Sequence, residues 1–114
     1  MDSEDNKNAK DFIFVKADLA YYRIDLKDIY FIESLLNYVL IHTKNNSFKT
    51  LISMKEMEKK LPEKNFVRIH NSYIVRIDKI AYIKYPQLIV QEKMKVLQIS
   101  ASYKENLFRR LNII

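Results

Sequence analysis

Phe66-Val-Arg-Ile-His-Asn-Ser-Tyr-Ile-Val75 is the stretch that decides the fold of this chain. It is an apolar run of the kind that forms β-strands, and Arg68, His70 and Asn71 interrupt it in close order. In a fully buried strand each of these polar side chains would need a partner or would cost a few kcal/mol. The pattern therefore indicates either an edge strand with a solvated face or a strand that leads into a loop touching a polar partner. Arg and Asn also carry the paired donors and acceptors that match base edges.

Working outward, short β-rich runs separated by polar breaks occupy most of the chain, and they follow one another in pairs. No long helical segment alternates with them, so a doubly wound α/β fold is excluded. The sequence predicts a mainly β fold with about ten short, mostly antiparallel strands. These lie near 12–16, 21–25, 28–33, 37–43, 48–52, 66–69, 72–75, 79–85, 88–91 and 96–99.

Two short helices are predicted, each from a capping box, in which a Ser precedes a Glu by three residues. The first opens at Ser53, with Glu56 three residues on, and ends before Pro62. The second opens at Ser102, with Glu105 three residues on. Its apolar side chains are expected to face inward: Tyr103, Leu107, Phe108 and Leu111.

The composition of the 114 residues indicates one globular domain with a basic surface. Residues 1–11 carry four acidic and two basic side chains, so the remaining chain holds 18 basic and 10 acidic side chains, a net charge of +8. This balance favours an acidic polymer as the partner. Basic amphipathic helices with bulky apolar faces are not evident, so a membrane is not the expected partner. The polar residues 1–11 are predicted to form a disordered linker or tail, and residues 12–114 the domain.

Several classes of chemistry are missing from the sequence. The chain has no Gly, so it contains neither a P-loop, a dinucleotide-binding fingerprint nor a G-x-S-x-G nucleophile elbow. It has no Cys and two His residues without a metal-ligand spacing, which makes a zinc or iron–sulfur site untenable. We therefore expect no enzyme activity, no catalytic residue, no metal and no cofactor, and a reducing, cytoplasmic compartment.

Six segments in order resemble a LytTR DNA-binding domain. They are Ile29–Ser34, Asn37–Thr43, Ser53–Pro62, Phe66–Val75, Asp78–Ile80 and Ile99–Lys104, within a resemblance that runs from about Phe12 to Leu111. The F-x-R-x-H-x-S-Y-I-V pattern of Phe66–Val75 is the most specific of them. The resemblance implies small stacked β-sheets with two short helices, and sequence-specific binding of double-stranded DNA by loops at sheet edges. Relatives often have Asp-Gly in the first turn, so Asp18-Leu19 predicts a looser or differently shaped turn here.

Family resemblance implies DNA contacts at three places. They are Asn37 with the following Tyr38, Asn71, and the segment Ser100–Lys104 with its Ala101 and Ser102. Many relatives carry Arg where this chain has Ala101, which removes one charge-assisted contact or shifts it to Lys104. The position after the His is often basic in relatives and is Asn71 here, which indicates a different sequence preference.

Strand alternation places Arg68 and His70 on one face, opposite Val67 and Ile69. That face is expected either to meet the DNA backbone or to orient the loop that carries Asn71. Lys104 is predicted to lie in the first turn of the last helix, where free backbone amides also attract phosphate.

The resemblance further implies a bacterial two-component response regulator, with a receiver domain joined through a linker such as residues 1–11. It implies binding to paired direct repeats and a monomeric isolated domain. Two other functions remain open from the residues themselves. Eight Tyr and six Phe would suit a single-stranded nucleic-acid or RNA-binding β module. An exposed sheet edge would suit a protein-interaction domain that accepts a partner strand.

Overall fold

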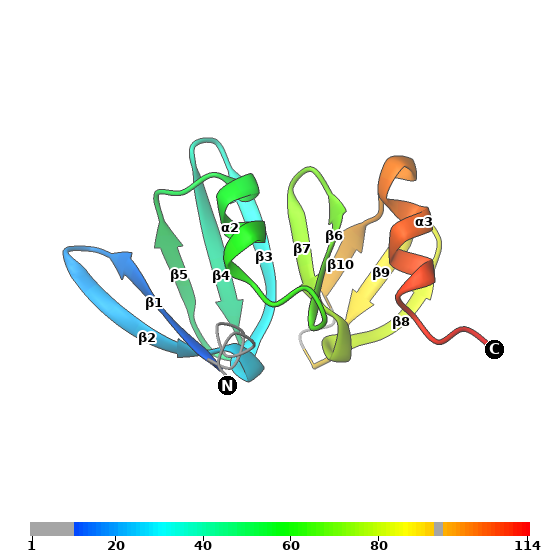
Figure 1. Cartoon of the computed structure of the whole chain (residues 1–114), viewed down its shortest axis with the longest axis horizontal. Helices are drawn as coiled ribbons and strands as arrows, with labels where there is room; N and C mark the ends of the chain where they lie inside the picture. Colours follow the sequence, from blue (N-terminus) through cyan, green and yellow to red (C-terminus); the bar gives the residue numbers. More distant parts are fainter. Residues whose placement is uncertain (1–10, 93–94) are drawn as a thin grey trace, which may run out of the picture.

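The computed structural model describes residues 11–92 and 95–114. The predicted linker, apart from Asp11, lies outside these residues. Within them the chain forms ten β-strands and two α-helices, as the sequence predicts, and two short 3-10 helices that were not predicted (Figure 1). In chain order the elements are β1 Phe12–Ala17, β2 Ala20–Asp25, η1 Leu26–Asp28, β3 Ile29–Leu35, β4 Tyr38–Thr43, β5 Ser47–Thr50, α2 Met54–Lys60, β6 Phe66–His70, β7 Tyr73–Arg76, η2 Ile77–Lys79, β8 Ile80–Lys84, β9 Gln87–Val90, β10 Lys95–Gln98 and α3 Ala101–Arg109.

The strands form three antiparallel sheets. A five-stranded sheet with the order β5-β4-β3-β7-β6 stands in the middle of the fold. The β1–β2 hairpin forms a two-stranded sheet, and β10-β9-β8 form a three-stranded sheet. Figure 1 shows the β1–β2 hairpin at one end of the molecule and the three-stranded sheet with α3 at the other.

Two apolar cores lie on opposite faces of the five-stranded sheet. One core packs the sheet against α2 and the β1–β2 hairpin, with Ile32, Ile41 and Met57 among its members. The other packs the sheet against the three-stranded sheet and α3, with Phe31 and Leu107 among its members. Because both faces are covered, β3 is buried over four consecutive residues instead of alternating. No helix in the described ranges is long and apolar enough to cross a membrane.

The first predicted helix cap is confirmed and the second is wrong. Ser53 precedes α2, and its Oγ accepts a hydrogen bond from the Glu56 amide at 3.1 Å. Helix α3 begins at Ala101, so Ser100 is its N-cap residue and Ser102 lies inside the first turn. The cause is tertiary, since the Ser100 amide donates to the Ile69 carbonyl at 2.9 Å and turns the chain into the helix two residues early.

Of the two possibilities predicted for the first turn, looser or differently shaped, the structure excludes the looser one. Asp18 and Leu19 form a tight two-residue turn, because Ala17 pairs directly with Ala20. Both turn residues have positive φ, 52° and 69°, as the primed hairpin turns require. In a chain without Gly, side-chain-bearing residues must adopt this backbone, and the turn between β3 and β4 does the same at Leu36, with φ 54°.

Candidate nucleic-acid interface

Three connections lie together at one edge of the molecule. They are the β3–β4 turn at residues 36–37, the β6–β7 turn at residues 71–72 and the start of α3 at residues 100–104; we call this set the loop edge (Figure 1). Backbone hydrogen bonds hold it together. The Ser34 amide donates to the Ser72 carbonyl at 2.9 Å, and the Ser100 amide donates to the Ile69 carbonyl at 2.9 Å. Segments separated by more than sixty residues in the sequence are thus brought to one surface.

Asn71 stands exposed at the tip of the β6–β7 turn. Its side-chain Oδ1 accepts a hydrogen bond from the Tyr103 hydroxyl at 3.1 Å. This bond fixes which way the amide faces, and it leaves the Nδ2 group and one lone pair of Oδ1 for a further partner. The sequence predicts Tyr103 as an inward-facing helix residue within the DNA-contacting segment Ser100–Lys104. It does not reveal the hydrogen bond to Asn71, because the two residues lie 32 positions apart.

Arg68 is occupied by the turn that carries Asn71. Its Nε donates to the His70 carbonyl at 3.2 Å and its Nη2 donates to the Asn71 carbonyl at 2.7 Å. The remaining Nη1 donates to Glu58 Oε1 at 3.1 Å, and the Arg68 side chain is only 16% exposed. Of the two roles expected for this face, orientation of the turn is the one that these contacts fit. Glu58, on α2, is a further member of the arrangement that no sequence pattern pointed to.

His70 forms a hydrogen bond within the same turn. Its Nδ1 accepts a hydrogen bond from the Ser72 amide at 3.0 Å, and its ring lies 5.4 Å from that of Tyr73. A nitrogen that accepts from an amide carries no proton, so the neutral ring holds its proton on Nε2. The half-buried imidazole therefore shapes the turn, while its Nε2 remains available as a donor.

Asn37 and Tyr38 lie in and directly after the β3–β4 turn. Asn37 is exposed, and its side chain has no hydrogen-bond partner within residues 11–92 and 95–114. Tyr38 is half-buried, and the Lys49 ammonium lies 4.2 Å from the centre of its ring. The turn thus presents the amide side chain of Asn37, and a cation–π contact between Lys49 and Tyr38 stabilises the hairpin next to it.

At the start of α3 the predicted residues divide into anchors and exposed groups. Ser100 is half-buried and bonded to β6, whereas Ala101, Ser102 and Lys104 are exposed. The Lys104 ammonium lies 4.3 Å from the centre of the Tyr85 ring, which draws its charge toward the three-stranded sheet. The structure therefore brings all the predicted DNA-contacting residues to one edge but leaves Ala101 without any polar group to offer.

A chain of hydrogen bonds joins the first three strands of the five-stranded sheet on one face. Glu33 Oε1 lies 3.0 Å from His42 Nε2, and His42 Nδ1 lies 2.9 Å from the Ser47 hydroxyl. The His42 ring stacks on Phe31 at 4.3 Å between ring centres. The carboxylate of Glu33, in an otherwise apolar strand, thus has a basic partner, and the three side chains link β3, β4 and β5.

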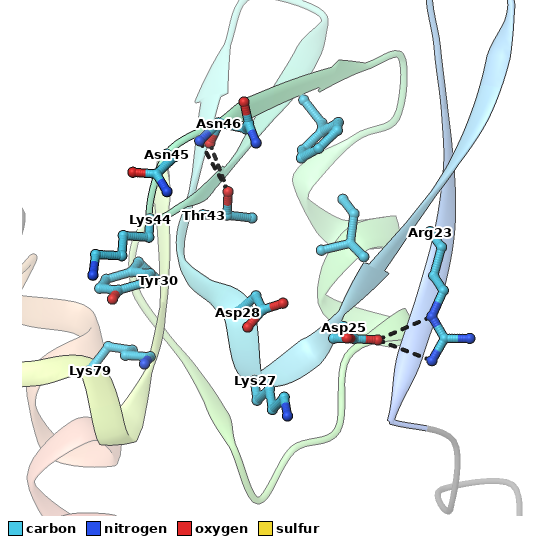
Figure 2. A pocket seen from close by; sticks show the side chains of 12 residues that line it. Arg23, Asp25, Lys27, Asp28, Tyr30, Thr43, Lys44, Asn45, Asn46 and Lys79 are labelled. Carbon is cyan, nitrogen blue, oxygen red and sulfur yellow. Dashed lines mark hydrogen bonds and ion pairs between the residues drawn. The ribbon is translucent and has the colours of Figure 1, made fainter.

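A polar pocket of about 480 Å³ lies at the opposite end of β4 from the loop edge (Figure 2). Its lining includes Lys27 of η1, Lys44 of the β4–β5 turn and Lys79 of η2, and none of the predicted DNA-contacting residues. At its wall Tyr30 donates a hydrogen bond to Glu92. This bond, together with burial and nearby negative charge, raises the pKa of Tyr30 to about 12, and it lowers the pKa of Glu92. The candidate interface is therefore a surface of turns, separate from this pocket.

Comparison with known proteins gives one family and a small set of relatives. The family model described as LytTr DNA-binding domain matches residues 20–112. The sensory transduction protein LytT of Bacillus subtilis is 30% identical over 98 residues, which cover 79% of this chain and 39% of that protein. LytT of Bacillus anthracis is 30% identical over 95 residues, covering 79% of this chain and 38% of that protein. The chain thus spans well under half the length of these curated relatives.

Among solved structures, the chain is similar to the LytTr DNA-binding domain of a methyl-accepting/DNA response regulator from Bacillus cereus. The TM-score is 0.77, and the match covers 91% of this chain and 99% of that chain at 18% sequence identity. At this identity the likeness shows that the fold is shared.

Proposed function

This chain belongs to the LytTR family of DNA-binding domains, and from that premise we propose how it recognises its site. The domain binds duplex DNA for a transcription regulator, and the loop edge is the surface that meets the DNA. The carrying observation is that the three segments expected to contact DNA, far apart in the sequence, are hydrogen-bonded into one edge. Neither α-helix acts as a recognition helix.

In this proposal Asn71 is the principal base-reading residue. An Asn side chain can pair with adenine through both its oxygen and its nitrogen, which contact N6 and N7 in the major groove. Tyr103 holds the amide of Asn71 in one orientation, and Arg68 holds the carbonyl of the same residue. Recognition gains from such preorganisation because the turn need not be ordered when DNA binds. His70 and Arg68 act mainly by shaping this turn.

The remaining residues of the edge have supporting roles. Asn37, with Tyr38 beneath it, offers a second amide to a neighbouring base, and Ser100 and Ser102 offer hydroxyl groups. Lys104 supplies charge to the phosphate backbone, a contact that fixes position without reading sequence. Ala101 offers no charge, so the start of α3 discriminates less between bases than it does in relatives with Arg at that position.

We extend the proposal to the protein context. The relatives are named sensory transduction proteins and are much longer than the matched segment, which supports the output domain of a two-component response regulator controlled by a receiver domain. Binding to paired direct repeats, a monomeric isolated domain, a cytoplasmic location and the absence of catalysis belong to the same proposal. A single-stranded nucleic-acid or RNA-binding module is not favoured, because the family model that matches residues 20–112 describes a DNA-binding domain.

Selection of bound duplexes from a random pool tests the proposal. The domain is mixed with random duplex DNA, bound molecules are amplified and sequenced, and the winning duplex is challenged with unrelated duplex, single-stranded DNA and RNA of the same length. We expect one enriched motif, and we expect only its own duplex to compete well. Enrichment of no motif, or better competition by single strands, would show that the loop edge does not read duplex DNA.

A further inference from the structure

Leu36 combines two features that are unfavourable for a leucine. It lies at the tip of the β3–β4 turn with φ 54°, in the left-handed region that Gly or Asn adopts far more readily. Its side chain is 97% exposed, so no apolar contact within the described chain compensates for the backbone. The exposed Leu36 side chain is thus free to contact a molecule outside the chain, and its position in the fold decides which molecule that is.

The position of Leu36 in the fold indicates which molecule its side chain contacts. It directly precedes Asn37, and the Ser34–Ser72 hydrogen bond attaches the β3–β4 turn to the turn that carries Asn71. Leu36 is therefore part of the loop edge. The major groove of B-form DNA is wide enough to admit a two-stranded β-ribbon, and the apolar group that base pairs present there is the 5-methyl of thymine.

Resting on the proposed function, we propose that Leu36 is a specificity-determining residue that packs against the 5-methyl group of a thymine in the major groove. The two residues of the β3–β4 turn then read neighbouring positions by different chemistry. Asn37 uses hydrogen bonds, and Leu36 uses burial of a methyl group. The backbone strain at Leu36 is the consequence of placing an apolar side chain where the turn would favour Gly.

The chain offers a matched control for this inference. Leu19 is also a leucine at positive φ, 69°, and it is 96% exposed at the tip of the β1–β2 hairpin. That hairpin forms a separate sheet at one end of the molecule (Figure 1). Substitution to Gly relieves the same backbone strain at both positions, so the folding effects should be alike while the effects on DNA binding differ.

The experiment compares the unmodified protein with Leu36→Gly, Leu19→Gly and Asn71→Ala on the duplex selected from the random pool. Thermal unfolding is measured beside fluorescence anisotropy titration. Both Leu→Gly variants should unfold at an equal or higher temperature than the unmodified protein. Leu36→Gly should weaken binding to the selected duplex about tenfold, as loss of a leucine contact predicts, and Leu19→Gly should leave it unchanged.

A second arm identifies the methyl group. Each thymine of the selected duplex is replaced in turn by uracil, which lacks only the 5-methyl. One replacement should weaken binding of the unmodified protein about fourfold and should have no effect on Leu36→Gly. If Asn71→Ala weakens binding but Leu36→Gly does not, or if every uracil replacement acts equally on both proteins, the inference is wrong while the proposed function stands. If the unmodified protein selects no duplex, both fail together.

Discussion

Asn71 and Tyr103 form a hydrogen-bonded pair. In the proposed interface the Asn71 side chain would read a base, and the Tyr103 hydroxyl would hold the Asn71 amide in position. Asn71→Ala should reduce affinity for the selected duplex by about 1–3 kcal/mol and affinity for unrelated duplex very little. Tyr103→Phe removes only the hydroxyl that donates to Asn71 Oδ1, and we expect a smaller loss, about 1 kcal/mol. Anisotropy titrations with both duplexes measure these losses.

The double variant separates orientation from direct contact. Once Asn71 is Ala, the Tyr103 hydroxyl has nothing to orient, so adding Tyr103→Phe should cost almost nothing more. Tyr21→Phe, at an exposed tyrosine of the β1–β2 hairpin, serves as the control and should bind like the unmodified protein. Full additivity of the two changes, or equal losses on both duplexes, would make these residues positioning contacts without base discrimination.

Tyr30 gives a pH-dependent contribution to stability through its hydrogen bond to Glu92. The folded-state pKa of Tyr30 is raised from 10.0 to about 12, so its contribution is complete below pH 10 and is lost as the pH rises through about 12. The pKa of Glu92 is lowered from 4.5, so its contribution is present above pH 4.5 and is lost as the pH falls further.

Tyr30→Phe removes the hydroxyl that donates to Glu92, so the difference in stability between the unmodified protein and this variant should depend on pH. We expect the unmodified protein to be more stable than Tyr30→Phe between pH 5 and pH 9, and the difference to shrink below pH 4.5 and above pH 10. Urea unfolding followed by circular dichroism at pH 3, 7 and 11 gives the three differences. A difference that stays constant from acid to alkali would mean that the hydrogen bond to Glu92 contributes nothing to folding.

At the scale of elements, substitution of the two serines predicted as helix caps should have different effects on stability. Ser53 caps α2 through its hydroxyl, so Ser53→Ala should lower the free energy of unfolding by about 1 kcal/mol. Ser102 lies exposed inside the first turn of α3, so Ser102→Ala should change it by less than about 0.5 kcal/mol. Urea titrations of both variants measure the difference. A larger loss for Ser102→Ala would contradict the observed start of α3.

The same contrast shows which parts of the fold are visible in the sequence. Alternation along β6 is a local property, so the buried Val67 and Ile69 and the half-buried Arg68 and His70 could be predicted from spacing. The start of α3 could not be predicted, because it depends on the hydrogen bond from the Ser100 amide to Ile69, 31 residues earlier.

For the site, the predicted positions stand at one edge, but the links between them were not predictable. The Tyr103–Asn71 hydrogen bond and the Arg68–Glu58 ion pair join different elements across many residues. No periodicity or local motif reports such contacts. The geometry of the glycine-free turns was also hidden, because a leucine at positive φ runs against the preference of that residue type.

At the scale of the whole molecule, charge should dominate the strength of DNA binding. The net charge of +8 on residues 12–114 predicts phosphate contacts from several Lys and Arg side chains and a log–log dependence of affinity on salt with a slope of roughly −3 to −6. Lys104→Ala should weaken binding to every duplex and make the slope shallower by about one. Anisotropy titration at several salt concentrations gives both quantities.

Lys27→Ala is the matched control for Lys104→Ala. It removes the same charge from η1, at the far end of the fold from the loop edge. We expect the slope of this variant to equal that of the unmodified protein. Equal effects of the two substitutions would point to a diffuse attraction by net charge, and a flat response of the unmodified protein to salt would argue against DNA binding altogether.

The loop edge separates the groups that hold its shape from the groups that it would present to DNA. Arg68, Tyr103 and the Ser34 and Ser100 amides hold the turns, while Leu36, Asn37, Ala101 and Ser102 stand exposed. Substitutions at the exposed positions leave the packed cores untouched and so carry little folding cost. After gene duplication, such a surface can therefore diverge quickly, so that copies of the domain would recognise different DNA sequences while the fold stays the same.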